Sequence, residues 1–234
     1  MSNATLYWND EERPDEVRAP DDIVDILFKI ECKQIPVDHA HLLASALRVA
    51  LPWIGAEPRL AIHTVHVAGS QNGWERPEHD TRSCLITSRR TKLTLRAPNH
   101  RAAELLRALP GTTLDLDGHR LTVGPGKIKS LSTETTLFAR YVALESACES
   151  DEAAFLAAAA QALATLEIRV RKALCGKAHP IATPEGPIAT RSLMLAGLTP
   201  HESIRLQQHG LGQHPLLGCG IFIPHKGIDA IKPT

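Results

Sequence analysis

Apolar and polar residues alternate along some segments of this chain and recur at helical spacing along others. The first alternating segment, residues 23–33, places Ile26, Phe28 and Ile30 on one face and charged residues on the other, as in a half-buried strand. Residues 39–51 instead carry leucine and alanine at intervals of three and four. That spacing predicts a helix, with Asp38 as its N-cap.

The same order of elements recurs in both halves of the chain. In the first half the pattern predicts strands at residues 23–33, 60–67, 83–88, 92–97 and 114–123, and helices at 39–51 and 99–109. In the second half it predicts strands at 137–144, 166–170, 188–195 and 218–223, and helices at 150–164 and 199–209. Each half reads β-α-β-β-α-β, with an extra strand in the first, which is the order of the ferredoxin-like unit. The sequence therefore predicts an α+β fold of two tandem ferredoxin-like domains.

The predicted domain boundaries follow from breaks in this pattern. Residues 1–20 are polar and contain Pro14 and Pro20, so we expect an irregular lead-in. Residues 21–127 should form the N-terminal ferredoxin-like domain and residues 128–234 the C-terminal one. The boundary is placed there because Gly-Pro-Gly at residues 124–126 is expected to break the chain.

Four glycines lie close together near the C-terminus, after a predicted helix and before a predicted strand: Gly210, Gly212, Gly218 and Gly220. A residue without a Cβ permits positive φ and lets a bulky partner approach the backbone N–H groups. Amides bared in this way suit a phosphate backbone. In a Rossmann loop the third glycine follows the second by three residues, but here that spacing is six, so a Rossmann loop is excluded. A Walker loop is excluded because it requires Gly-Lys-Ser/Thr, which is absent here.

Five short motifs accompany this glycine-rich loop. The most specific is Gly-Cys-Gly-Ile-Phe-Ile-Pro-His-Lys at residues 218–226. The others are Pro-Val-Asp-His-Ala at 36–40, Asn-Gly-Trp-Glu-Arg-Pro at 72–77, Ser-Arg-Arg-Thr-Lys-Leu-Thr-Leu-Arg at 88–96 and Thr-Arg-Ser-Leu-Met at 190–194. Together they resemble the myxobacterial-type branch of the CRISPR repeat RNA-processing endoribonucleases, which belong to the RAMP superfamily. The resemblance runs from about residue 23 to residue 228.

This resemblance implies a fold and an activity. The fold is two ferredoxin-like domains with a C-terminal glycine-rich loop. The activity is metal-independent cleavage of precursor CRISPR RNA within each repeat, in which the 2′-hydroxyl attacks the adjacent phosphate and leaves a 2′,3′-cyclic phosphate and a 5′-hydroxyl. No cofactor is expected. The expected partners are the repeat RNA, as a hairpin, and other subunits of a CRISPR interference complex, without direct contact to DNA.

Chemistry of this kind needs groups that take and give protons near neutral pH, and histidine is the natural choice. His39 is the first candidate, because it lies at the first turn of the predicted helix, where the helix dipole favours neutral imidazole. The catalytic histidine of many family members lies at or near this helix. A packed role in the core stays open for His39. His41, on the polar face of the same helix, and His63, within a predicted strand, are the other candidates.

The expected RNA-binding residues are basic side chains, the loop glycines and one tryptophan. Net charge is zero, but acidic residues cluster early and basic residues later, so one basic face is compatible with the composition. Ordinary solvated charge is the alternative. The tryptophan could stack on a base or pack over the core. The full predicted set is Arg89, Arg90, Lys92, Arg96, Arg169, Arg171, Lys172, Arg191, Gly210, Gly212, Gly218, Gly220, Lys226 and Trp74.

Other features of the sequence argue against several classes of protein. The 5 cysteines are scattered without a Cys-x-x-Cys pair, which fits a reducing cytoplasm better than a disulfide framework or a zinc knuckle. No apolar stretch approaches about 18 residues and the N-terminus lacks the shape of a signal peptide, so no membrane partner is expected. The pairs His39/His41 and His63/His66 lack further ligands nearby, so we expect no metal site.

Two other functions stay open from the sequence. A catalytically silent RAMP subunit, which binds the repeat RNA only as a scaffold, would carry the same glycine-rich loop. A duplicated ferredoxin-like protein that binds a small molecule would fit the neutral net charge, because this fold hosts many functions. Loss of cleavage on replacing His39 or His41 distinguishes the enzyme from the scaffold. Indifference to structured RNA would favour the small-molecule protein.

Overall fold

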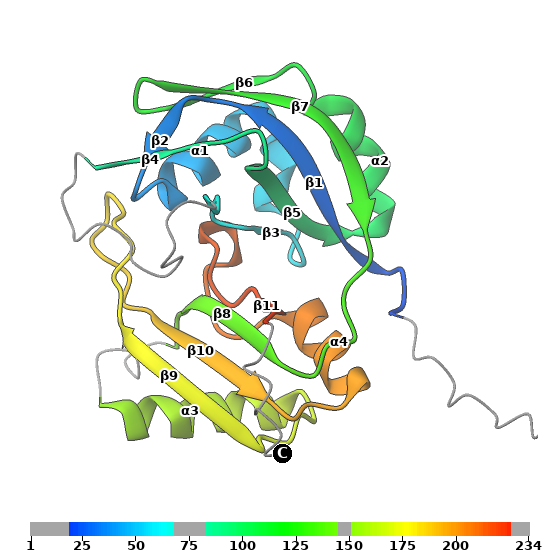
Figure 1. Cartoon of the computed structure of the whole chain (residues 1–234), viewed down its shortest axis with the longest axis vertical. Coiled ribbons are helices and arrows are strands. Elements are labelled where there is room, and N and C mark those ends of the chain that lie inside the picture. Colours follow the sequence, from blue (N-terminus) through cyan, green and yellow to red (C-terminus); the bar gives the residue numbers. More distant parts are fainter. Residues whose placement is uncertain (1–18, 68–82, 145–150, 226–234) are drawn as a thin grey trace, which may run out of the picture.

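Two antiparallel sheets, built from consecutive halves of the chain, organise the structure (Figure 1). The computed structural model describes residues 19–67, 83–144 and 151–225. The five-stranded sheet of the first half lies at the top of Figure 1 and the four-stranded sheet of the second half lies below it. Trp74, Lys226 and almost all of the predicted lead-in at residues 1–20 fall outside the described residues.

The N-terminal sheet has the strand order β3-β5-β1-β7-β6. Its strands are β1 (Ile23–Glu31), β3 (Ala61–Ile62), β5 (Lys92–Pro98), β6 (Thr113–Leu116) and β7 (His119–Lys129). The alternation in β1 has the predicted consequence, since Ile26 and Phe28 are fully buried against the helices. The predicted strand 114–123 is a hairpin, in which Asp117 and Gly118, both with positive φ, join β6 to β7.

Two predicted strands of this half differ from the structure. The segment 60–67 contributes only β3, because after His63 the chain leaves the sheet and the Val65 N–H bonds to a histidine side chain instead. The segment 83–88 contains β4 (Cys84–Ile86), which does not join the main sheet. It pairs with β2 (Gln34–Pro36) in a separate two-stranded ladder.

The C-terminal sheet has the strand order β11-β8-β10-β9. Its strands are β8 (Leu137–Val142), β9 (Lys172–Ala178), β10 (Arg191–Ala196) and β11 (Ile223–Pro224). If the four strands are ranked by their order along the chain, this sheet reads fourth-first-third-second. The strands β7-β1-β5-β3 of the first sheet have the same order. The predicted strand at 166–170 is wrong, because Glu167 has positive φ and the Ile168 N–H bonds to Leu163 to close the preceding helix. Glycine turns likewise shorten the predicted strand 218–223 to β11.

Four helices are close to those expected: α1 (Ala40–Ala50), α2 (Asn99–Ala108), α3 (Glu152–Thr165) and α4 (Pro200–His209). Two 3₁₀ turns, η1 (Pro52–Gly55) and η3 (Pro215–Leu217), accompany them. Asp38 does not cap α1; its carboxylate accepts a bond of 3.0 Å from the Ala182 N–H of the other half. Asp151 caps α3, and Thr199 caps α4 in a capping box with Glu202.

The passage between the halves comes later than predicted. β7 continues through Gly124 and Gly126 to Lys129, so these glycines do not break the chain, and the predicted boundary between residues 127 and 128 cuts a strand. A Cβ at Gly126 would collide with the Phe28 ring and with Leu106, which explains the glycine within a strand. The connection to the second half therefore begins after Lys129.

Each half has its own apolar core, and a third cluster joins them. The first core packs β1 and β5 against α1 and α2, and the second packs β8 and β10 against α3 and α4. The third cluster is Ala40, Tyr141, Ala143, Ile181 and Cys219, which brings the start of α1 against residues of the second half. None of the helices in the described ranges is long and apolar enough to cross a membrane.

Glu202 makes the stability of the α4 end depend on pH. Its carboxylate accepts bonds from the Thr199 and Arg169 N–H groups and from the Arg171 guanidinium. Burial raises the pKa of Glu202, but the Thr199 N–H and Arg171 outweigh burial and lower the pKa from 4.5 to about 2. A lowered pKa stabilises the folded state above the unfolded pKa and loses that contribution as pH falls.

We therefore expect Glu202→Gln to lower the melting temperature at pH 7 and to have little effect at pH 2. Thermal unfolding of both proteins between pH 7 and pH 2 measures this, and the two curves should converge between about pH 4.5 and pH 2. A constant difference across that range would show that the carboxylate charge contributes nothing.

Candidate functional site

His39 is a structural residue in this fold. Only 1% of it is exposed, and both ring nitrogens are engaged. Its Nδ1–H donates to the Pro36 carbonyl at 2.9 Å, and its Nε2 accepts the Val65 N–H at 2.8 Å. With both nitrogens occupied, the ring has neither a lone pair nor a proton to offer a substrate. The burial of His39 and its two hydrogen bonds favour the core role that the sequence left open over the role of catalytic base.

His41 lies two residues further, on the first turn of α1, and is partly exposed. Its Nε2 lies 3.3 Å from the Ser45 hydroxyl, one helical turn away. Residues four apart on a helix face each other, so this contact follows from the sequence spacing. A partly exposed imidazole at the positive end of a helix, oriented by a hydroxyl, can accept or donate a proton at a substrate.

His63 faces the interior. Its Nε2 lies 3.4 Å from Asp25 without the alignment of a hydrogen bond. Burial lowers the pKa of His63, although Asp25 opposes the shift. The ring also lines a cavity of about 30 Å³ where the two halves meet, beside Arg140 and Gly218. A cavity of this size admits about one water molecule, so a nucleotide does not reach His63 in this arrangement.

Asp25 and Arg96 form a buried ion pair beside His63. The guanidinium donates to both carboxylate oxygens, with Nε to Oδ1 at 2.8 Å and Nη2 to Oδ2 at 3.1 Å. Burial raises the pKa of Asp25, but His63 and Arg96 more than offset it and hold the pKa well below its usual range. Asp25 was missed by sequence reasoning; its place on the polar face of β1 was the only available signal.

Arg96 also joins the two halves. Its Nη1 donates to the carbonyls of Gln207, at 3.1 Å, and of Phe222, at 3.0 Å. Only 3% of the residue is exposed. The prediction that Arg96 binds RNA is therefore corrected, because its donors are engaged inside the protein.

The glycine-rich loop packs against the protein instead of presenting bare amides. The N–H groups of Gly210, Gly218 and Gly220 donate to the carbonyls of Leu206, Pro215 and Tyr141, in that order. A Cβ at Gly212 would collide with the Ala143 carbonyl, and one at Gly218 with Thr64 and Ile62 of the first half. All four loop glycines have positive φ. The expectation of phosphate-binding amides is corrected for these three N–H groups. Gly218 lets the two halves approach closely, and the other three glycines let the loop pack against its own half.

The predicted basic residues of the first half lie at the turn between β4 and β5. Arg89 and Arg90 are exposed there. Lys92 is partly buried, and its Nζ donates to the Arg89 carbonyl at 3.2 Å. These three side chains are available to a polyanion.

The predicted basic residues of the second half lie around β9 and β10. Arg169 and Lys172 are exposed, whereas Arg171 is paired with Glu202 at 2.7 Å. Arg191 is partly buried and its Nη1 donates to the Gly176 carbonyl at 3.3 Å. The two predicted basic groups therefore belong to different halves of the structure.

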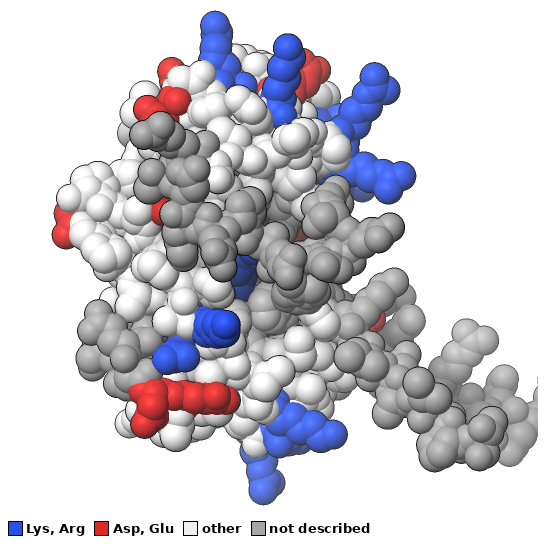
Figure 2. Space-filling model, turned by 60° about the vertical axis from the view of Figure 1, so that its left-hand side comes forward, with Lys and Arg blue, Asp and Glu red and all other residues white. Residues whose placement is uncertain are grey.

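Charged side chains are distributed unevenly over the surface. On the face in Figure 2, Lys and Arg side chains gather toward the upper end, with smaller groups in the middle and at the lower end. Within the described ranges, no three His, Cys, Asp or Glu side chains lie close enough together to hold a metal ion.

Comparison with known proteins identifies the family. A family model described as Cas6 Crispr matches residues 24–227. The chain belongs to the Cas6 family. It is 33% identical over 201 residues to a protein of Myxococcus xanthus (strain DK1622) described as a CRISPR-associated endonuclease Cas6, covering 86% of this chain and 81% of that protein. The resemblance to the RAMP-type CRISPR repeat-processing proteins is thereby confirmed.

Solved Cas6 structures share this fold. A structure described as CRISPR associated protein Cas6 superposes with a TM-score of 0.60 at 12% identity, covering 87% of this chain and all of the other. A Cas6-related protein from Pyrococcus furiosus gives a TM-score of 0.56 at 14% identity, with coverages of 86% and 97%. At these identities the likeness concerns the mixed α/β fold with antiparallel sheets.

Replacement of Arg96 should destabilise the protein strongly. Arg96→Met leaves the Asp25 carboxylate and the Gln207 and Phe222 carbonyls without their donor, so the free energy of unfolding should fall by about 3–5 kcal/mol. Denaturation in urea measures this. The exposed control Arg90→Met should change it by less than about 0.5 kcal/mol. Equal effects of the two variants would contradict the role given to Arg96.

Replacement of His39 should also act on stability. His39→Ala leaves the buried Val65 N–H without an acceptor, so we expect a loss of about 1–3 kcal/mol in urea denaturation. His201→Ala, on the exposed first turn of α4, is the control and should be neutral. An unchanged stability of His39→Ala, together with lost activity, would return His39 to the catalytic site.

Proposed function

We propose that this Cas6 protein is a metal-independent endoribonuclease that cleaves precursor CRISPR RNA within its repeats to give mature guide RNA. Family membership and the endonuclease description of the Myxococcus relative support the substrate and the activity. The observation that carries the mechanism is His41, a partly exposed imidazole on the first turn of α1 with Ser45 as its hydrogen-bond partner.

The proposed fold assignment is two tandem ferredoxin-like domains. Its support is the order of the antiparallel strands. In both β7-β1-β5-β3 of the first half and β11-β8-β10-β9 of the second, the strands lie in the order fourth, first, third and second along the chain. Each half supplies two helices to one face of its sheet. This is the arrangement that a repeated β-α-β-β-α-β unit produces.

In the proposed reaction His41 carries a proton. The 2′-oxygen of the nucleotide before the scissile phosphate attacks phosphorus while its proton passes to a base. The bond from phosphorus to the 5′-oxygen breaks, and that oxygen takes a proton, leaving a 2′,3′-cyclic phosphate and a 5′-hydroxyl.

The proposed contacts to the repeat RNA come from basic residues that are exposed or partly buried. Arg89, Arg90 and Lys92 would contact phosphate in the first half, and Arg169, Lys172 and Arg191 in the second. Lys226 and Trp74 remain proposed contacts outside the described residues. The proposed setting is the cytoplasm, with other subunits of an interference complex as further partners and no direct contact to DNA.

The decisive experiment is cleavage of repeat RNA in EDTA. The wild-type protein should cleave an RNA that contains its own repeat, and the product should carry a 2′,3′-cyclic phosphate. His41→Ala should bind the RNA but cleave about 10²–10⁴ times more slowly, the range for loss of one general acid or base. His201→Ala, which also removes an exposed histidine from a first helical turn, should cleave normally.

Three other outcomes separate the alternatives. Binding without cleavage by the wild-type protein would make it a silent scaffold subunit. Cleavage of an RNA with 2′-deoxyribose before the scissile phosphate would contradict transesterification, because that substrate lacks the nucleophile. Full activity of His41→Ala would move the proton carrier to another residue.

A further inference from the structure

The N-terminal sheet has one face turned away from its helices. Along β1, Ile26 and Phe28 point into the core shared with α1 and α2, so Asp25, Leu27 and Lys29 point to the other side. We call this other side of the N-terminal sheet the open face; the second half of the chain covers it at Asp25 and Arg96, where Arg96 bonds to Gln207 and Phe222. Figure 1 shows α2 behind β1 and β7, on the opposite side from it.

Lysines gather on the open face from three neighbouring strands. Lys29 of β1 lies directly opposite Lys92 of β5. Lys127 and Lys129 of β7 lie opposite Leu27 and Asp25 of β1. Side chains directly opposite one another in an antiparallel pair have Cβ atoms about 4.5–5.5 Å apart, and like charges in such a pair destabilise the sheet. The pair Lys29 and Lys92 is therefore unfavourable in the free protein.

These lysines are not neutralised by the fold. In the described part of the chain none of Lys29, Lys92, Lys127 and Lys129 forms a salt bridge. Asp25, the acidic residue nearest to Lys129 on the sheet, is already neutralised by Arg96. The other acidic residues of the face, Glu31 and Asp115, lie toward its far end. The open face therefore carries an excess of positive charge that the protein leaves uncompensated.

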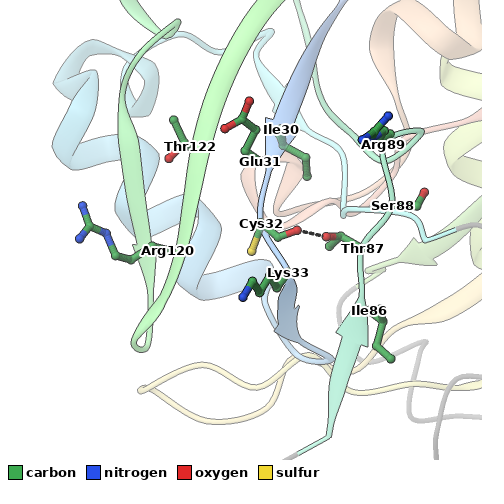
Figure 3. Close-up of a pocket in the computed structure, with 10 residues that line it drawn as sticks. All are labelled: Ile30, Glu31, Cys32, Lys33, Ile86, Thr87, Ser88, Arg89, Arg120 and Thr122. Atoms are coloured by element: carbon green, nitrogen blue, oxygen red, sulfur yellow. Dashed lines mark hydrogen bonds between the residues drawn. The ribbon is translucent and has the colours of Figure 1, made fainter.

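A pocket lies at the far end of the same face (Figure 3). Its volume is about 810 Å³, and it is lined by the end of β1, the segment after β4 and the start of β7. Glu31 and its cross-strand partner Thr122 continue the alternation of the open face into it. The Thr87 hydroxyl donates to the Cys32 carbonyl, which ties the β4 side of the pocket to β1.

The lining of the pocket combines positive charge with apolar surface. Lys33, Arg89 and Arg120 supply three cations, and Figure 3 shows Arg89 and Arg120 on opposite sides. Glu31 adds one carboxylate, and Ile86, which is 76% exposed, supplies the apolar part. A phosphate with an unpaired base needs both kinds of surface.

We propose that the open face binds a single-stranded segment of RNA, with its phosphates along Lys29, Lys92, Lys127 and Lys129 and one nucleotide in the pocket of Figure 3. The proposal rests on the proposed function for its substrate class, but not on His41. A sheet face with unpaired cations across three strands follows an extended strand, and the pocket has room for a nucleotide that is not stacked in a duplex. Binding would also relieve the repulsion between Lys29 and Lys92.

The test compares two double variants with equal loss of charge. Lys127→Gln/Lys129→Gln removes two cations from the open face. Arg107→Gln/Lys177→Gln removes two exposed cations from α2 and β9, away from that face. Binding of each double variant is measured to two RNAs that are fully 2′-O-methylated and therefore resist cleavage. One RNA is a repeat hairpin with single-stranded flanks, and the other is the hairpin alone. Dissociation constants are measured at several salt concentrations.

We expect the open-face variant to bind the flanked RNA more weakly and with a salt slope reduced by about 0.7 for each lysine removed. Its affinity for the hairpin alone, and both affinities of the control variant, should stay within about twofold of wild type. An unchanged salt slope for the flanked RNA would overturn the proposal. Equal losses for both RNAs would mean that the face binds duplex RNA, which also overturns it.

Two single variants examine the remaining parts of the proposal. Lys29→Gln should raise the melting temperature of the free protein by about 1–3 °C, because it removes the repulsion with Lys92. The same variant should bind the flanked RNA more weakly. Ile86→Asp should weaken binding of the flanked RNA, because it places a carboxylate in the pocket. Leu174→Asp, at another exposed apolar site on β9, should not weaken it. If Ile86→Asp and Leu174→Asp bound the flanked RNA equally well, the pocket would not be part of the RNA-binding surface.

The results also separate this proposal from the proposed function. If the wild-type protein cleaved repeat RNA and the open-face variant bound the flanked RNA normally, only the proposal for the open face would be overturned. A wild-type protein that binds neither RNA would overturn both.

Discussion

The bidentate ion pair between Arg96 and Asp25 constrains the rest of the structure. The Arg96 guanidinium is buried, and a buried guanidinium that loses a partner is left with an uncompensated donor, so Arg96 must keep all its partners. Two of these partners are backbone carbonyls of the other half, at Gln207 near the end of α4 and at Phe222 just before β11. A backbone carbonyl cannot move without its element, so one guanidinium fixes both α4 and the last strand against the first sheet.

The consequences of this docking reach α1. With the halves held together, the Asp38 carboxylate accepts the Ala182 N–H, and Gly218 lies against Thr64 and Ile62. His39 is then enclosed between Pro36 and Val65, while His41, two residues later, turns toward solvent. The first turn of α1 is thus supported on one side by its own half and on the other by the second half. Such a rigid base suits a side chain that must meet a scissile phosphate in one geometry.

The sequence predicted what depends on local pattern and failed where partners are distant along the chain. The limits of α1, α2 and α4 and the family itself followed from spacing and motifs. Arg96 looked like an RNA contact because its carbonyl partners lie 111 and 126 residues away. The choice between His39 and His41 depended in the same way on Val65, a residue 26 positions on. Glycine signalled close approach correctly, but what approaches Gly218 is Thr64 of the same chain.

Zero net charge and RNA binding are compatible in this protein because its charges are used in two different ways. Several arginines are held by carboxylates, as Arg171 is by Glu202 and Arg205 by Glu167, and contribute little to the field outside the molecule. The lysines of the open face have no such partners among the described residues. At physiological salt a polyanion senses charge within about 8 Å, so it responds to this local excess and not to the sum over the chain. The unfavourable pair of Lys29 and Lys92 is then a stability cost that only a bound polyanion offsets, which is why we expect the open face to be a binding surface.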